Sequence, residues 1–273
     1  MIEGMMEYTR LRQIVVPSPE IMAGATGPVT LAGMMVQHNA EVLSMITLMQ
    51  LMSPGTPVLY GAVSTIMDMR TTMTRLGSPE VGITHVGFAQ LAKWYNIPCR
   101  GAAGNTDSKT LDVQAGYETA FNLMLATCAG FNYITYALGG MDFSNTLCYE
   151  KILTDHELLG MIECLTRGVE VNDDTLAVDI IDMVGPGGHF LANKHTRNYL
   201  EREHFIPRLL DTQSYYGWLA AGSKGIREKA TEEVRRILKE HHADPLDKDL
   251  ERGLEQYVKK IEKHQVNAVH SSR

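Results

Sequence analysis

Short apolar runs alternate with longer stretches of helical character over most of the first 168 residues. Apolar runs bounded by glycine, proline and small polar residues are typical of buried strands, and the longer stretches are typical of helices. The runs occupy residues 14–16, 57–63, 97–103 and 131–138, and the helices that follow them cover about 30–52, begin at 79, and end near 129 and 167. Four strand–helix units in this order predict an α/β fold with a parallel sheet and right-handed crossovers.

Four strand–helix units are too few for a complete barrel. A TIM (β/α)8 barrel needs eight such units and about 250 residues. The four units predicted here would make half of such a barrel over residues 1–170, followed by a charged helical extension over residues 171–273. Because half a barrel leaves strand edges unpaired, we expect the rest to come from a longer gene product, from another chain or from a homo-oligomer.

Composition and charge narrow the class of protein. The chain is 44% hydrophobic and 21% charged, which is typical of a globular protein. Its net charge of -7 argues against nucleic acid or an anionic membrane as the main partner, because both would repel an acidic surface. The four cysteines form no Cys-x-x-Cys pair, so no metal site is expected. The longest apolar segment, residues 42–52, is too short to cross a bilayer, and no secretion signal is recognisable, so we expect a cytoplasmic protein.

Short motifs spread from about residue 14 to about residue 255 resemble those of the trimethylamine:corrinoid methyltransferase family, in the same order and at near-identical spacing. They are Gly27-Pro-Val-Thr-Leu-Ala-Gly, His38-Asn-Ala-Glu-Val-Leu, Tyr60-Gly, Leu76-Gly-Ser-Pro-Glu, Asp107-Ser-Lys, Gln114-Ala-Gly, Phe190-Leu-Ala and Trp218-x-x-Ala-Gly-Ser-Lys. The resemblance implies that the chain carries the carboxy-terminal four units of the family's barrel.

The resemblance also implies a reaction. A methyl group moves from the nitrogen of a small methylated amine to Co(I) of a corrinoid, which a partner corrinoid protein presents and the methyltransferase does not bind tightly. Co(I) is a strong nucleophile and the amine leaves without a proton. The reaction therefore needs no acid–base pair and no Ser-His-Asp triad, and the sequence displays neither.

One position indicates the class of amine. Trimethylamine-specific members of the family carry pyrrolysine shortly before a Ser-Asp-x-Lys motif, and alignment on Asp107, Lys109 and Gln114-Ala-Gly places Asn105 there. A tertiary amine has a lone pair that can add to the imine of pyrrolysine, whereas a quaternary ammonium has no lone pair. A quaternary ammonium is already activated, because its leaving group is a neutral tertiary amine. The sequence therefore resembles members that act on glycine betaine and similar quaternary amines.

Candidate site residues follow the predicted strands, because barrel enzymes place their pockets at the carboxyl ends of strands. We predict catalytic roles for Asn105 and Asp107. Predicted substrate contacts are Arg70 as a carboxylate clamp, the aromatic faces of Tyr60, Tyr136 and Phe143, and the polar groups of Thr106 and Glu41. Each has a structural alternative: an Asx turn for the loop residues, a solvated loop for the arginine, and packing for the others.

Two other functions are compatible with the pattern. A truncated, non-catalytic fragment could bind methylamines or dock a corrinoid protein, because half a barrel holds only half of a pocket. An unrelated parallel α/β enzyme is the other alternative, which the ordered motifs disfavour.

Overall fold

The computed structural model describes residues 2–271, with side chains up to residue 263. The chain forms two compact units, Met1–Val234 and Arg235–Arg273. The predicted boundary near residue 170 lies inside the first unit and stays a prediction.

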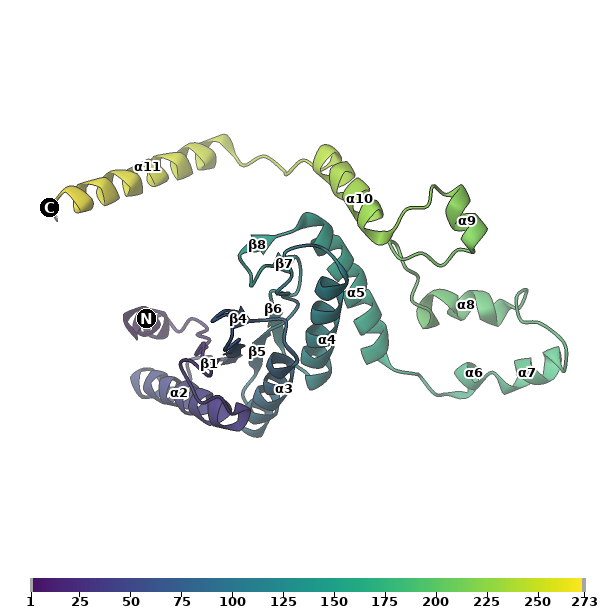
Figure 1. Ribbon diagram of the computed structural model, residues 1–273, viewed down its shortest axis with the longest axis horizontal. Coiled ribbons are helices and arrows are strands. Elements are labelled where there is room, and N and C mark those ends of the chain that lie inside the picture. The colour runs from purple at the N-terminus through teal and green to yellow at the C-terminus, as the bar shows by residue number, and fades with distance from the viewer. Residues whose placement is uncertain (1, 272–273) are drawn as a thin grey trace. The chain divides into compact units, whose positions relative to one another are not determined.

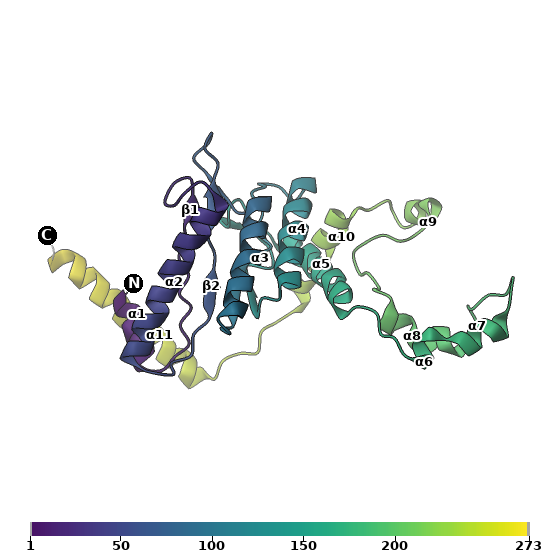
Figure 2. The same cartoon turned by 90° about the horizontal axis from the view of Figure 1, so that it is seen from below.

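A parallel sheet and four helices form the centre of the first unit. The strands β2 (Tyr60–Ala62), β5 (Cys99–Ala102) and β6 (Tyr133–Thr135) pair in the order β2-β5-β6, and Val15 adds a parallel bridge to Val58. The helices α2 (Leu31–Met52), α3 (Pro79–Trp94), α4 (Val113–Ala129) and α5 (Tyr149–Arg167) each pack against the next (Figures 1 and 2). The predicted mixed α/β class is confirmed. The described residues form no closed barrel, and a barrel remains a proposal.

Two smaller sheets lie in the loops that follow the parallel strands. The first has the order β1-β3-β4 and joins β1 (Met22–Ala23), β3 (Thr65–Met67) and β4 (Thr74–Arg75); the second pairs β7 (Gly140–Met141) with β8 (Thr146–Leu147). The sequence predicts these segments as loops, because strands of two or three residues are too short to display an alternating pattern. They add structure to the edge where the carboxyl ends of the parallel strands meet.

The predicted helix starts agree with the structure, although one cap differs. Pro79 occupies the first turn of α3 as expected, but the Ser78 hydroxyl is buried and has no hydrogen-bond partner among the described residues. Asp112 caps α4 by accepting a hydrogen bond from the Ala115 amide at 3.1 Å. The short amino-terminal helix α1 (Ile2–Arg10), which the sequence does not predict, packs against α2.

The chain beyond α5 is helical, as predicted. The helices are α6 (Asp173–Leu176), α7 (Val178–Val184), α8 (Lys194–Glu203), α9 (Tyr215–Ala220), α10 (Ile226–Glu240) and α11 (Lys248–Ser271). The buried Glu157 of α5 fixes part of this segment, because its Oε1 accepts hydrogen bonds from the amides of Arg208, Leu209 and Leu210 at 2.8, 2.9 and 3.1 Å.

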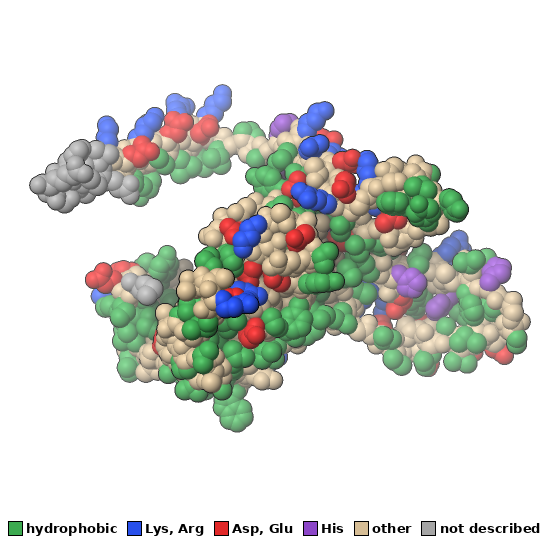
Figure 3. Space-filling view, viewed as in Figure 1, with side chains coloured by type: hydrophobic (Ala, Val, Ile, Leu, Met, Phe, Trp, Pro, Cys, Tyr) green, Lys and Arg blue, Asp and Glu red, His purple; other side chains and the backbone are tan. Residues whose placement is uncertain are grey.

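The last helix is amphipathic. Leu250, Leu254, Val258 and Ile261 recur at helical spacing and are 42–53% exposed, while the charged side chains of α11 gather on its other side (Figure 3). Within residues 2–271, every helix is too short or too polar to cross a membrane.

Two neutral histidines lie in the core between the sheet and the helices. His38 is fully buried, with Nδ1 2.7 Å from Ser64 Oγ, Nε2 2.8 Å from the Gly61 carbonyl, and its ring stacked on Phe88. His85 is 2% exposed, and neither ring nitrogen has a partner among the described residues. Burial lowers the pKa of both imidazoles from 6.5 to about 4.

These histidines predict an acid-sensitive fold. Below pH 6.5 the unfolded chain takes up protons that the folded chain excludes, so stability falls with pH until the folded pKa near 4 is reached. Between pH 7.5 and 5.5 each histidine should lower the free energy of unfolding by about 1.3 kcal/mol. Urea unfolding of the wild-type chain and of His85→Leu at both pH values measures this. Equal pH dependence of the two proteins would contradict the assignment of His85.

Candidate functional site

The segment that follows β5 is the most deeply buried loop at the carboxyl ends of the strands. We call residues 104–108 the Asn105 loop. All five residues are buried, and the four polar ones, Asn105, Thr106, Asp107 and Ser108, are at most 5% exposed. A loop with this many buried polar groups requires many hydrogen bonds. The partners of each side chain therefore indicate its role.

Asp107 uses its carboxylate to hold two loops together. Its Oδ1 accepts hydrogen bonds from the amides of Leu76 and Gly77 at 2.8 and 3.1 Å, and its Oδ2 pairs with Arg75 Nε at 2.8 Å. Its own amide donates to Glu118 Oε2 at 2.7 Å. This arrangement joins the loop after β2 to the loop after β5, so Asp107 has the surroundings of a structural brace. Its predicted catalytic role stays a prediction.

Thr106 is held by α4. Its fully buried hydroxyl donates to Glu118 Oε2 at 2.6 Å and accepts from the Ser108 amide at 3.0 Å. The other carboxylate oxygen of Glu118 accepts from Gln114 Nε2 at 2.9 Å. Glu118 thus orders the Asn105 loop from the first turns of α4, and Thr106 contributes to that order.

Asn105 differs from its neighbours because its side chain is not fully satisfied. It is 5% exposed, and its buried Oδ1 has no hydrogen-bond partner among the described residues. The turn after β6 passes close beside it: a Cβ atom on Gly140 would lie 2.1 Å from Asn105 Oδ1. A buried acceptor without a partner costs roughly 1–3 kcal/mol. Asn105 is therefore the residue of this loop whose side-chain acceptor has no hydrogen-bond partner among the described residues.

Two aromatic rings near this edge already face basic groups. Tyr136 directly follows β6, and the Arg100 guanidinium of β5 lies 5.7 Å from the centre of its ring. Lys109 Nζ lies 4.0 Å from the centre of the Phe143 ring and 3.6 Å from Asp142. The Phe143 amide donates to the Thr106 carbonyl at 3.3 Å, which fixes this turn to the Asn105 loop. Both rings are thus placed where a cation can contact a ring face.

Arg70 lies at the outer end of a charged network. Its side chain is 85% exposed and donates to both carboxylate oxygens of Asp68, at 3.3 and 3.0 Å. These hydrogen bonds hold the pKa of Asp68 well below its ordinary value. Asp68 also lies 3.4 Å from Arg75, which pairs with Asp107. Arg70 is therefore linked to the Asn105 loop only through this network, in an exposed turn.

The other two predicted residues lie elsewhere. Tyr60 is fully buried in the core, and its hydroxyl donates to Asn39 Oδ1 at 3.1 Å, as expected of a packing position; its predicted substrate contact stays a prediction. Glu41 lies on the exposed side of α2 and accepts from Gln37 at 3.0 Å. The structure therefore brings Asn105, Thr106, Asp107 and Phe143 together, with Tyr136 following the neighbouring strand, and separates Tyr60 and Glu41 from them.

Sequence reasoning missed two groups. Arg100 is half-buried on β5, and no hydrogen bond or ion pair engages its guanidinium among the described residues; a charge inside the apolar run 97–103 was the available signal. Lys151 and Asp155 form a buried ion pair on α5, for which the signal was an opposite-charge pair four residues apart.

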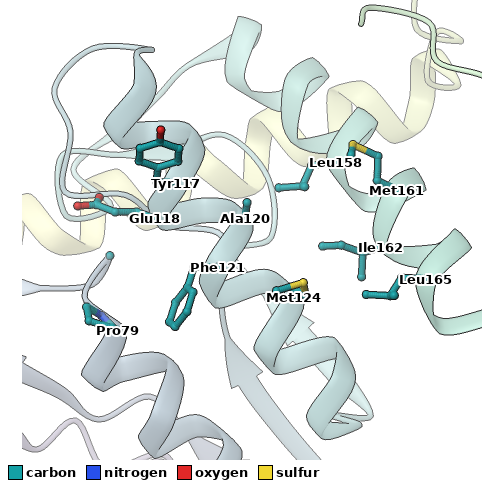
Figure 4. A pocket seen from close by; sticks show the side chains of 11 residues that line it. Pro79, Tyr117, Glu118, Ala120, Phe121, Met124, Leu158, Met161, Ile162 and Leu165 are labelled. Carbon is teal, nitrogen blue, oxygen red and sulfur yellow. The ribbon is translucent and has the colours of Figure 1, made fainter.

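An apolar groove of about 680 Å³ opens between α4 and α5, on the helical layer. Figure 4 shows Phe121 and Met124 of α4 opposite Leu158, Ile162 and Leu165 of α5. Its one acidic lining residue, Glu118, is already bonded to the Asn105 loop. The groove offers hydrophobic contact but no chemistry, so we place the candidate site at the Asn105 loop.

Comparison with known proteins identifies the family to which this chain is similar. A model of the trimethylamine methyltransferase family (MTTB) matches residues 1–265. The glycine betaine methyltransferase of Desulfitobacterium hafniense strain Y51 is 38% identical over 94% of this chain and 54% of its own length. Trimethylamine methyltransferases MttB of D. hafniense strain DCB-2 and of Methanosarcina barkeri are 41% and 38% identical over 88% and 89% of this chain, and over 48% of their own lengths.

The chain thus spans about half the length of the relatives that it matches. The family model nevertheless covers nearly all of the chain, including the Asn105 loop, the strands β2, β5 and β6 and the helices α2 to α5. The chain belongs to the trimethylamine methyltransferase (MTTB) family.

Proposed function

We propose that this chain is part of a methyltransferase that demethylates a quaternary amine such as glycine betaine and transfers the methyl group to the Co(I) corrinoid of a partner protein. The observation that carries the proposal is Asn105, a buried residue whose side-chain oxygen has no hydrogen-bond partner among the described residues, at the position where trimethylamine-specific members have pyrrolysine. The similarity to a glycine betaine methyltransferase supports it.

The surroundings of the acidic residues agree with a reaction that moves no proton. The electron pair of the broken C–N bond stays on nitrogen, which leaves as a neutral amine, and Co(I) supplies the pair for the new bond to carbon. No general acid or base is needed, and Asp107 and Glu118 are both committed to holding loops. The protein's contribution is to position the amine and exclude water.

Charge distribution suggests how a betaine would be oriented. Arg100 has no acidic partner among the described residues and can form a bidentate pair with a carboxylate. The ring of Tyr136, which already contacts Arg100, can also lie against an ammonium group. We therefore propose that Arg100 binds the carboxylate while Tyr136 and the amide oxygen of Asn105 face the methylated nitrogen.

The rest of the assembly is proposed on the family resemblance. Further strands, from outside this chain or from another copy, would complete an eight-unit barrel, and the corrinoid protein would approach the carboxyl ends of the strands. The cytoplasm is the proposed location. The alternative is a non-catalytic fragment that binds methylamines or docks a corrinoid protein.

Replacing Arg100 tests the orientation of the substrate. Arg100→Met should lower kcat/KM for glycine betaine by about 30- to 150-fold, which corresponds to a lost charge-assisted contact of about 2–3 kcal/mol. Arg100→Lys should recover little, because an ammonium cannot reproduce the guanidinium fork. Any activity with choline, which has no carboxylate, should be unchanged.

Arg70→Met is the matched control, because Arg70 is exposed and already paired with Asp68. A selective loss with Arg70→Met and none with Arg100→Met would assign the carboxylate clamp to Arg70, as the sequence predicts. Equal losses for both substrates with Arg100→Met would mean that Arg100 stabilises the fold.

A further inference from the structure

A buried ion pair lies beneath the Asn105 loop. Lys151 and Asp155 are one turn apart on α5 and are 1% and 4% exposed. Lys151 Nζ donates to Asp155 Oδ2 at 2.6 Å and to the Gly104 carbonyl at 2.8 Å. Asp155 Oδ2 also accepts from the Gly139 amide at 2.8 Å. The pair thus bonds to two loops, one after β5 and one after β6.

The two bonded glycines directly precede the residues that meet at the site. Gly104 precedes Asn105, and Gly139 precedes Gly140, on which a Cβ atom would lie 2.1 Å from Asn105 Oδ1. Gly104 has a φ of +93°, and a Cβ on it would lie 2.6–2.8 Å from the backbone of Ala137, so the loops are in direct contact. Their relative placement therefore decides where Asn105 Oδ1 lies.

A contribution to folding stability alone does not explain why Lys151 and Asp155 are buried as an ion pair. Removing an ammonium and a carboxylate from water is costly, and burial lowers the pKa of Lys151 and raises that of Asp155. Well-packed apolar residues of similar volume are often as stabilising as a buried ion pair, or more so. The Gly104 carbonyl also accepts a hydrogen bond from Thr119 Oγ1 at 3.2 Å, whereas the Gly139 amide donates to Asp155. Apolar residues in place of the pair could not join these two groups, and that link is the property the ion pair adds.

We infer that Lys151 and Asp155 are positioning residues that fix the Asn105 loop against the turn after β6, and so set the location of Asn105 in the methyl-transfer site. This inference rests on the proposed function for its catalytic part. The loop-ordering part depends on geometry alone and has its own measurement.

The test compares two double substitutions. Lys151→Met with Asp155→Leu removes both charges and keeps the bulk, whereas Lys151→Gln with Asp155→Asn keeps groups that can bond to the two glycines. The matched control is Lys229→Met with Asp211→Leu, an ion pair of 2.8 Å whose side chains are about a quarter exposed. Hydrogen exchange is followed for residues 104–108 and 139–142, together with urea unfolding, kcat and KM.

The apolar variant should unfold at nearly the same urea concentration as the wild type, yet exchange roughly tenfold faster or more in both loops while α4 and α5 stay protected. Its kcat for glycine betaine should fall by up to about 100-fold with a much smaller change in KM, because displacement by about 1 Å can have that effect. The amide variant should restore most of the loop protection and kcat, and the surface control should change neither.

Wild-type protection of both loops in the apolar variant would overturn the inference. Uniform destabilisation of the whole chain in both double variants, without selective loop exchange, would overturn it too, because the pair would then be only a stabilising element. A wild-type enzyme that transfers no methyl group would contradict the proposed function instead, and the exchange measurements would still decide whether the pair positions the loop.

Discussion

Replacing Asp107 with Ala should lower the free energy of unfolding by about 3–5 kcal/mol, because it removes one partner of a buried, hydrogen-bonded ion pair. The carboxylate is 5% exposed and bonds to Arg75 and to the amides of Leu76 and Gly77. Its loss would leave the Leu76 and Gly77 amides without their acceptor and would leave Arg75 with its 3.4 Å contact to Asp68, so the loop after β2 would detach from the Asn105 loop. Urea unfolding at pH 7.5, followed by circular dichroism, measures the change.

Asp112→Ala is the matched control for this substitution. Asp112 caps α4 from the exposed side of the same segment, so its loss should cost about 1 kcal/mol. If Asp107→Ala retained wild-type stability but lost methyl transfer, Asp107 would act in the reaction itself, as the sequence predicts, and the brace described above would be wrong.

The elements that the sequence predicts well are those that carry their own signal. The helices α2 to α5 are long and lie where the pattern places them, and the strands β2, β5 and β6 lie inside the predicted apolar runs. The small sheets of β1, β3, β4, β7 and β8 could not be predicted, because strands of two or three residues are defined by their pairing and are too short to carry a sequence pattern of their own.

The site shows the same limit at the level of side chains. The Asn105 loop was predictable because it follows an apolar run that ends in glycine and small residues. The sequence could not decide between a core position and a substrate contact for Tyr60, because in a continuously apolar run nothing indicates which side of the sheet a residue faces. Lys151 and Asp155 look in sequence like an ordinary exposed helix pair, and only the tertiary fold buries them.

The largest effect that we expect is the difference in methyl transfer between quaternary amines and trimethylamine, because it depends on whether the amine has a good leaving group. The leaving group of a quaternary amine is a neutral tertiary amine, whereas trimethylamine must be activated before dimethylamine can leave. The amide of Asn105 offers no electrophile to the lone pair of trimethylamine, and the nearby carboxylates of Asp107 and Glu118 are already bonded to loop groups. Glycine betaine should therefore be demethylated and trimethylamine should not.

The most direct measurement offers each amine separately to the enzyme that contains this chain, together with a Co(I) corrinoid protein, and follows the cobalt absorbance. We predict the absorbance change of corrinoid methylation with glycine betaine or another quaternary amine, and a change no larger than the amine-free background with trimethylamine. Methylation with trimethylamine and none with any quaternary amine would contradict the account.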